Sequence, residues 1–226
     1  MIGQLVFGSG GPRQGEREKL YGLPVLRVRA DMDSFWWERR VKKAGRALFR
    51  GGARRVLVPR GFPCWPLLSE YGLAPVDPGP FLRAQSPALA LALLERRGAA
   101  PDRSTVVLCG ARADWEMTRV AVTLCSQVRN LVIDAPKGGE ELARWLRGEF
   151  GVPILPRREG GQAALCFHPD GARGEEPTLE LYGHAPDLAG LSLSAPHLGE
   201  GDREDLDLLA ALYEFGRLNK EELKIT

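Results

Sequence analysis

A cysteine and a histidine stand two residues apart in the segment CFHPD, residues 166–170. Side chains alternate along a β-strand, so Cys166 and His168 are expected to share one face. A thiol beside an imidazole can serve as a nucleophile with its base, or as half of a metal site. Either site needs further groups, which only distant residues such as His184 or His197 could supply. We therefore favour a buried cysteine followed by a histidine at the strand end, and we expect no metal site.

The turn after the apolar run VVLC is the second place where chemistry is expected, because a helical pattern follows Gly110 almost at once. A glycine between a strand and a helix is typical of the turn that binds the pyrophosphate of a dinucleotide. Aligned on Gly110, the GxGxxG pattern has Arg112 at its second glycine and Trp115 at its third. The Arg112 side chain hinders close approach of the backbone to a pyrophosphate, although this side chain could itself hold a phosphate. Trp115 conflicts with close packing of the helix on the strand.

Two carboxylates begin the helix after this turn. Asp114 is placed to cap the helix, and Glu116 follows in its first turn. Negative charge there neutralises the positive helix end that an anion would otherwise use. The pattern predicts that the protein's own carboxylates occupy the position of the phosphate.

The order from residue 104 onward is strand, turn, helix, strand and helix, and the second strand ends in Asp134, 24 residues after Gly110. Over residues 104–155 this layout resembles the Rossmann domains of the shikimate dehydrogenase and glutamyl-tRNA reductase type, with the glycine motif lost. The resemblance implies that a bound NAD(P) would be held by Gly110, Arg112 and Asp134, the last on the ribose hydroxyls.

No catalytic residue follows from this resemblance. Residues 1–98 lack the Lys/Asp pattern of a shikimate dehydrogenase, and Cys64 lies in GFPCWP, unlike the cysteine motif of glutamyl-tRNA reductases. None of the four cysteines forms a CxxC pair, which weighs against a structural zinc site. We expect reduced thiols that act as small buried hydrophobic groups.

Short apolar runs alternate with helical stretches along the whole chain. This alternation favours an α/β, Rossmann-like fold with a mostly parallel sheet flanked by helices. The expected strands are residues 23–30, 54–59, 104–110 and 130–135, a weaker candidate at 73–77, and two strands of an antiparallel edge or hairpin at 163–168 and 178–183. The expected helices run from near Ser34 to Gly51, from an N-cap at Ser86 with Pro87 at the first helical position to Gly98, over residues 138–151, and from a cap at Asp202 toward Gly216.

The stretch GAAPDRS is the best candidate for a boundary between lobes. It suggests an N-terminal α/β lobe over residues 1–98 and a Rossmann-like lobe over residues 99–226, although a single continuous sheet also fits. With 44% hydrophobic residues, the chain of 226 residues can build a core of this kind. Neither a secretory signal nor a stretch long enough to span a membrane stands out, so we expect a cytoplasmic protein without a membrane partner.

Charge is unevenly distributed although the net charge is only +2. Residues 1–60 hold 14 basic against 5 acidic residues, and residues 169–226 hold 5 against 13. Because the two excesses nearly cancel, we expect the ends to attract each other and the C-terminal helix to pack back on the N-terminal part. The basic segment 36–55 begins with aromatic residues and could bind nucleic acid. The balanced total and the lack of a recognised nucleic-acid-binding module weigh against that partner.

Three classes of function therefore stay open. The favoured one is a non-catalytic, degenerate Rossmann-like scaffold that acts through a protein partner or as a homo-oligomer. The alternative is an NAD(P)- or other nucleotide-dependent enzyme with a diverged phosphate loop. The third is a nucleic-acid-binding protein that uses the basic first helix. Whether the protein is an enzyme is left open.

Overall fold

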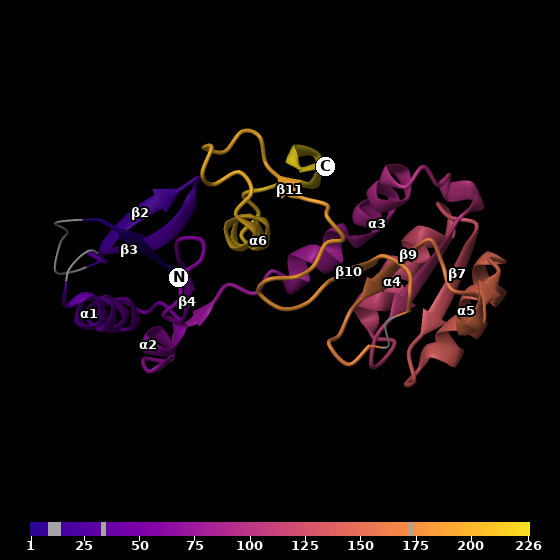
Figure 1. Cartoon of the computed structure of the whole chain (residues 1–226), viewed down its shortest axis with the longest axis horizontal. Coiled ribbons are helices and arrows are strands. Elements are labelled where there is room, and N and C mark those ends of the chain that lie inside the picture. The colour runs from indigo at the N-terminus through magenta and orange to yellow at the C-terminus, as the bar shows by residue number, and fades with distance from the viewer. Residues whose placement is uncertain (9–14, 33–34, 172–173) are drawn as a thin grey trace. The chain divides into compact units, whose positions relative to one another are not determined.

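The computed structural model describes residues 1–8, 15–32, 35–171 and 174–226, and it divides into two compact units (Figure 1). Unit 1 comprises Met1–Asp77 and Ala195–Glu222, and unit 2 comprises Pro78–Ser194 and Leu223–Thr226. The division thus falls before residue 98, because the helix that ends there packs within unit 2. Part of the C-terminal region belongs to unit 1 instead of the second lobe.

Unit 1 is built on a five-stranded sheet in the order β2-β3-β1-β4-β5. Its elements are β1 Ile2–Phe7, β2 Glu16–Leu20, β3 Leu23–Ala30, α1 Trp37–Arg50, β4 Arg55–Leu57, α2 Trp65–Ser69, β5 Ala74–Pro75, α6 Leu206–Glu214 and the short η3 Lys220–Glu222. All neighbouring strands are parallel except β2, which pairs antiparallel with β3. The central strand β1 and the charged edge strand β2 were not expected from the sequence.

Helix α1 covers the core of unit 1 with one apolar face. Val41, Ala44 and Leu48 are buried, as the helical spacing of apolar residues predicted. The expected start near Ser34 lies outside the described residues, and the helix begins at Trp37.

The C-terminal helix α6 belongs to the same unit as the basic N-terminal part, which confirms that it packs back on it. Arg55 forms a two-pronged ion pair with Glu214, with N···O distances of 2.5 and 2.7 Å. The expected cap at Asp202 is wrong. Asp205 caps α6 by accepting a hydrogen bond from the Leu208 amide at 3.1 Å, whereas Asp202 accepts one from the Tyr21 hydroxyl at 2.8 Å.

Unit 2 contains a five-stranded, wholly parallel sheet in the order β10-β9-β6-β7-β8. Its elements are α3 Gly79–Arg96, η1 Pro101–Arg103, β6 Thr105–Cys109, α4 Trp115–Cys125, β7 Asn130–Asp134, α5 Gly139–Phe150, β8 Ile154–Leu155, η2 Arg157–Glu159, β9 Ala163–Cys166 and β10 Thr178–Glu180, together with a small antiparallel pair, β11 Leu193–Ser194 and β12 Lys224–Ile225. Reading from β6, the order is that of a Rossmann sheet, so the expected fold class is confirmed.

Strand β9 lies inside this sheet, between β6 and β10, and not at an antiparallel edge as expected. Ala163–Cys166 are all buried, and strands buried on both faces belong to parallel sheets. The position of β9 matters for function because it brings the segment CFHPD beside the glycine turn that follows β6.

Helix α3 begins at Gly79, seven residues before the expected N-cap Ser86, and contains Pro87 in its interior. Pro87 has no amide proton to donate to the carbonyl of Arg83, four residues earlier. The Ser86 hydroxyl donates to that carbonyl instead, at 2.9 Å, which supplies the missing partner. Among the described residues, no helix is long and apolar enough to cross a bilayer.

Candidate functional site

The carboxyl ends of β6 and β9 form the point of unit 2 at which the strand order reverses. Cys109 and Cys166 are the last register partners of these two strands. In open α/β sheets, ligands bind in the crevice outside this point. Gly110 and His168 come just after the two strand ends, so both expected sites converge here.

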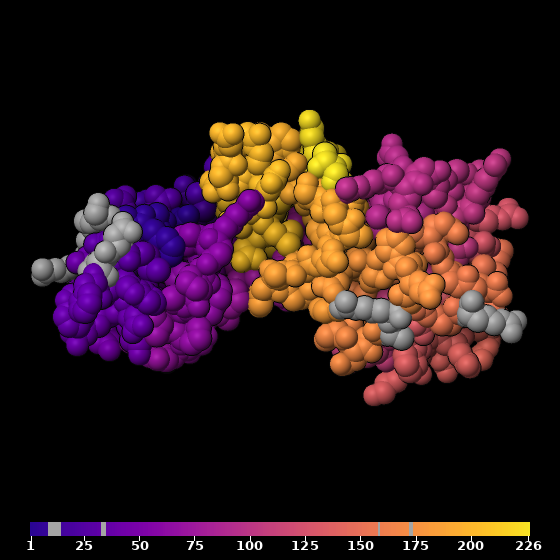
Figure 2. All heavy atoms as spheres, viewed as in Figure 1, coloured from indigo at the N-terminus to yellow at the C-terminus, as the bar shows by residue number. Residues whose placement is uncertain are grey.

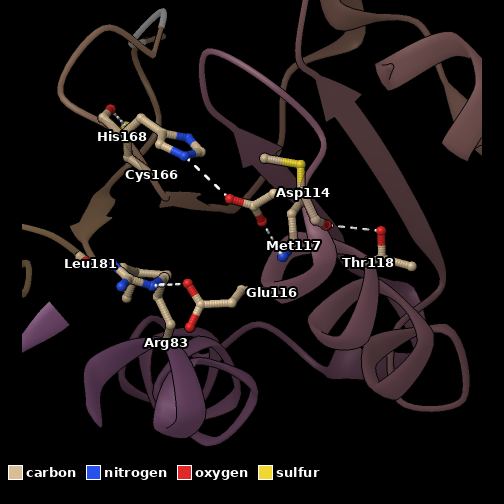
Figure 3. A network of polar contacts seen from close by, with 8 residues as sticks. All are labelled: Arg83, Asp114, Glu116, Met117, Thr118, Cys166, His168 and Leu181. Carbon is tan, nitrogen blue, oxygen red and sulfur yellow. Dashed lines mark hydrogen bonds and ion pairs between the residues drawn. The ribbon is translucent and has the colours of Figure 1, made fainter. Parts of the chain in front are cut away.

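The imidazole of His168 fills the crevice above Gly110. A Cβ atom placed on Gly110 would lie 2.6 Å from His168 Nδ1. The ring is held by Asp114, whose Oδ2 lies 3.2 Å from His168 Nε2 (Figure 3). Gly171 closes the same turn, because a Cβ atom placed on it would lie 3.2 Å from the Gly110 backbone. The space directly above Gly110 is therefore filled by the chain's own atoms.

Both carboxylates at the start of α4 are engaged, and the expected cap at Asp114 is confirmed. Asp114 Oδ1 accepts a hydrogen bond from the Met117 amide at 3.0 Å and so caps the helix. Glu116 forms an ion pair with Arg83 of α3, which also donates to the carbonyl of Leu181 at 2.9 Å. Figure 3 shows these two contacts side by side with the His168–Asp114 pair.

Backbone amides of the glycine turn are also used within the chain. Gly110 donates to the carbonyl of Asp134 at 3.0 Å, and Ala113 donates to the carbonyl of Lys137 at 2.8 Å. Arg112 is paired with Lys137 in a one-residue parallel bridge, and its side chain is exposed. Trp115 was expected to conflict with close packing of the helix on the strand, but its side chain does not lie between them. It is the first residue of α4 and is 75% exposed.

Asp134, the expected partner of a ribose, is paired with an arginine. Arg157 Nε lies 2.9 Å from Asp134 Oδ2, and Arg157 Nη1 lies 2.5 Å from Glu176 Oε1. Burial, the largest single influence, would raise the pKa of Glu176, but the hydrogen bond from Arg157, a backbone hydrogen bond and the positive charge of Arg157 together outweigh burial and lower that pKa. Arg157 thus bridges the two carboxylates, whose combined charge of −2 its single positive charge halves.

The Cys109 thiol beside the crevice is a poor nucleophile. Cys166 donates to the main-chain carbonyl of His168 at 3.2 Å, while the imidazole faces Asp114. The hydrogen bond between Cys109 and Cys166, together with burial, raises the pKa of Cys109 far above its ordinary value. Nucleophilic attack needs the thiolate. Residues in the described part of the chain include no group of three or more His, Cys, Asp or Glu arranged to hold a metal ion.

Comparison with known proteins shows a distant likeness to Rossmann-type dehydrogenases. No family model and no curated protein matches the chain. The structure of L-tryptophan dehydrogenase from Nostoc punctiforme aligns with 12% identity and a TM-score of 0.31, over 57% of this chain and 39% of that one. Shikimate dehydrogenase 1 from Peptoclostridium difficile aligns with 10% identity and a TM-score of 0.25, over 76% of this chain and 68% of the enzyme. This likeness is one of fold.

A separate cleft of about 860 Å³ lies beside the carboxyl ends of β7 and β8. Asp134, Arg144, Arg147 and Arg157 are among the residues that line it. Its size falls in the range of small-molecule sites. It lies within unit 2, next to the ion pair of Asp134 with Arg157.

Several residues that shape the crevice were not expected from the sequence. Arg157 lies in residues 156–162, where neither a strand nor a helix was expected, and Arg83 precedes the expected start of its helix. Gly171 gave no signal beyond its place in a loop. Two adjacent arginines, separated from the end of β8 by Pro156 alone, were the one hint that a charged partner for Asp134 lay there.

Proposed function

We propose that this chain is a Rossmann-like scaffold that binds no dinucleotide at the crevice after Gly110 and acts by associating with a second copy or with another protein. The observation that carries the proposal is the His168 ring seated on Gly110 and held by Asp114. A pyrophosphate would have to displace this ring and lie against a carboxylate that already caps α4.

The outer surface of unit 2 supports the second half of the proposal. Trp145 and Phe150 of α5 are both exposed, and their ring centroids lie 5.6 Å apart in an edge-to-face arrangement. Trp115 adds a third exposed ring at the start of α4. Exposed aromatic side chains are enriched in the cores of protein interfaces.

Thermal unfolding with NAD and NADP tests the closed crevice. A ligand present at about 100 times its dissociation constant raises the free energy of unfolding by about 2.7 kcal/mol. We expect neither NAD nor NADP to raise the free energy of unfolding of the natural sequence by binding against Gly110. A shift that the His168→Ala variant enlarges would contradict the proposal, because it would show a dinucleotide competing with the ring.

Light scattering across a wide range of protein concentration tests association. We expect the Trp145→Ala/Phe150→Ala variant to remain monomeric where the natural sequence forms dimers. The Tyr213→Ala variant, altered in unit 1, is the matched control and should leave the dimer unchanged. Equal masses for all three proteins at every concentration would argue against self-association through α5.

A nucleotide-dependent activity is the second candidate, and the cleft beside β7 and β8 favours it. A ligand confined to this cleft would not need to cross Gly110. It could contact Asp134 and the guanidinium groups of Arg144 and Arg147. Calorimetric titration with AMP, NADP and S-adenosylmethionine tests this candidate. Binding that is lost in Arg144→Ala/Arg147→Ala and kept in Arg129→Ala would favour it over the scaffold.

A further inference from the structure

One face of α1 carries a line of basic side chains. They are spaced four, three and four residues apart, and all are exposed. On a helix this spacing places them in one row, opposite the buried Val41, Ala44 and Leu48. We call this row the basic stripe; it consists of Arg39, Lys43, Arg46 and Arg50.

The basic stripe has no acidic partner within the described part of the chain, unlike its neighbours. Arg40 pairs with Asp31 at 3.1 Å, and Lys42 pairs with Glu70 at 2.9 Å. The four residues of the stripe form no such ion pair. Their positive potential is therefore concentrated on one face of α1. Part of the surface of unit 1 near α1 is seen at the lower left of Figure 2.

The balanced total charge does not remove this potential. Acidic residues of the C-terminal segment are used elsewhere in unit 1: Glu214 pairs with Arg55, Asp202 accepts a hydrogen bond from Tyr21, and Asp205 caps α6. The sequence argument against a polyanionic partner assumed that these acids would offset the basic helix. In the structure these three carboxylates lie against Arg55, Tyr21 and the start of α6, and none of them pairs with the basic stripe.

Aromatic rings accompany the arginines of this surface. The guanidinium group of Arg39 lies 4.3 Å from the ring centroid of Trp36, and that of Arg46 lies 5.7 Å from the ring of Tyr71. Phe35, at the start of the helix, is 87% exposed. Guanidinium planes and free aromatic rings are the surfaces on which unpaired bases stack.

We propose that the basic stripe of α1 binds single-stranded nucleic acid, with phosphates along the stripe and a base on the ring of Phe35. The stripe spans eleven residue steps, or about 16 Å, which is long enough for several phosphates. An exposed ring favours unpaired bases over the closed stack of a duplex. A lipid surface fits less well, because the apolar face of α1 is buried in the core of unit 1 and cannot enter a bilayer.

Fluorescence anisotropy of a labelled, mixed-sequence single-stranded oligonucleotide tests the proposal across a salt series. Four phosphate contacts give a slope of about −2.8 in a plot of log affinity against log salt. Affinity should thus fall about 50-fold between about 50 and 200 mM salt.

The decisive variant replaces the four residues of the basic stripe by alanine, and we expect it to lose binding and the salt slope. The matched control removes the same charge from exposed arginines of unit 2, as Arg97→Ala/Arg103→Ala/Arg119→Ala/Arg129→Ala, and should keep both. Circular dichroism establishes that both variants are folded. Phe35→Ala should weaken binding about 5- to 150-fold and leave the slope unchanged.

Each opposite result would overturn the proposal. Absence of binding by the natural sequence at low salt would do so, and so would an equal loss in the stripe and control variants. Preference for a duplex of the same sequence, or for phosphatidylserine vesicles over the oligonucleotide, would assign the stripe to a different partner.

Discussion

Replacing Gly110 by alanine tests directly whether His168 fills the crevice. The Gly110 backbone lies outside the left-handed region, so alanine fits its conformation. The added Cβ would lie 2.6 Å from His168 Nδ1 and 3.1 Å from Met117 Cε. The methionine end is flexible, whereas the ring is held by Asp114. The loss of stability in the Gly110→Ala variant should therefore arise from overlap of the added Cβ atom with the His168 ring.

The expected size of the effect follows from these contacts. Overpacking a tight site costs about 1–3 kcal/mol. In the His168→Ala variant, which lacks the ring, the same substitution should stabilise the folded protein by about 0.4–1 kcal/mol, because alanine restricts the unfolded chain. Gly110→Ala should therefore destabilise the natural sequence and stabilise the His168→Ala variant. The coupling energy between the two positions should reach about 1.4–4 kcal/mol.

Urea unfolding of the natural sequence, the two single variants and the double variant measures this coupling. The two units are fitted as separate transitions if the curves show two steps. Additivity within about 0.5 kcal/mol would refute the reasoning, because it would mean that the His168 ring does not lie against Gly110.

Three further predictions concern packing, capping and pH. Gly171→Ala should cost about 1–3 kcal/mol in urea unfolding, and His168→Ala should not relieve that cost, because the nearest atoms include the Gly110 backbone at 3.2 Å. Burial raises the pKa of Asp205, so ionising it in the folded state costs stability as the pH rises through that pKa. At neutral pH, Asp205→Asn should thus match or exceed the natural sequence in thermal stability, and Asp205→Ala should lose about 1 kcal/mol with the cap. The ion pair with Arg55 lowers the pKa of Glu214, so its contribution is complete above the ordinary value of 4.5 and is lost as the pH falls through the folded value. Since the Glu214 carboxylate is 48% exposed, Glu214→Gln should cost less than about 1 kcal/mol at neutral pH, and a pH series of melting curves should show the difference vanish in acid.

The sequence predicted the elements around the crevice well, because their signals are local. The apolar run before Gly110, the cap at Asp114 and the strand that ends in Asp134 are each encoded within a few residues. The expectation that negative charge stands at the start of α4 followed from two side chains in one helical turn, Asp114 and Glu116. Signals of this kind do not depend on what the rest of the chain does.

The position of β9 could not be predicted in the same way. A short buried run has the same composition at the edge of a sheet and at its centre. The pairing of β9 with β6 depends on distant contacts, and so does the contact of His168 with Gly110. The charge partner of Asp134 was missed for this reason too, since Arg157 reaches Asp134 only because β8, which precedes η2 in the chain, pairs with β7.

The start of helix α3 was predicted wrongly for a different reason. Pro87 after Ser86 is the usual signature of a helix start, and only the bond from the Ser86 hydroxyl to the Arg83 carbonyl makes the same pair acceptable inside a helix. The Ser86–Pro87 pair was therefore compatible both with the start of a helix and with the interior of one. Packing of α3 against α4 and β9 selected the longer helix.

The discontinuity of unit 1 has a consequence for synthesis on the ribosome. Its sheet is encoded before residue 78, yet Ala195–Glu222 join it only after all of Pro78–Ser194 has been made. The strands β6 to β10 of unit 2 are contiguous and can pair as they emerge, whereas the nascent N-terminal sheet must wait for α6. During that interval, unit 1 lacks a helix whose Leu208, Leu209 and Leu212 are all buried in the finished protein. The chain is therefore most in need of chaperone protection at its oldest end.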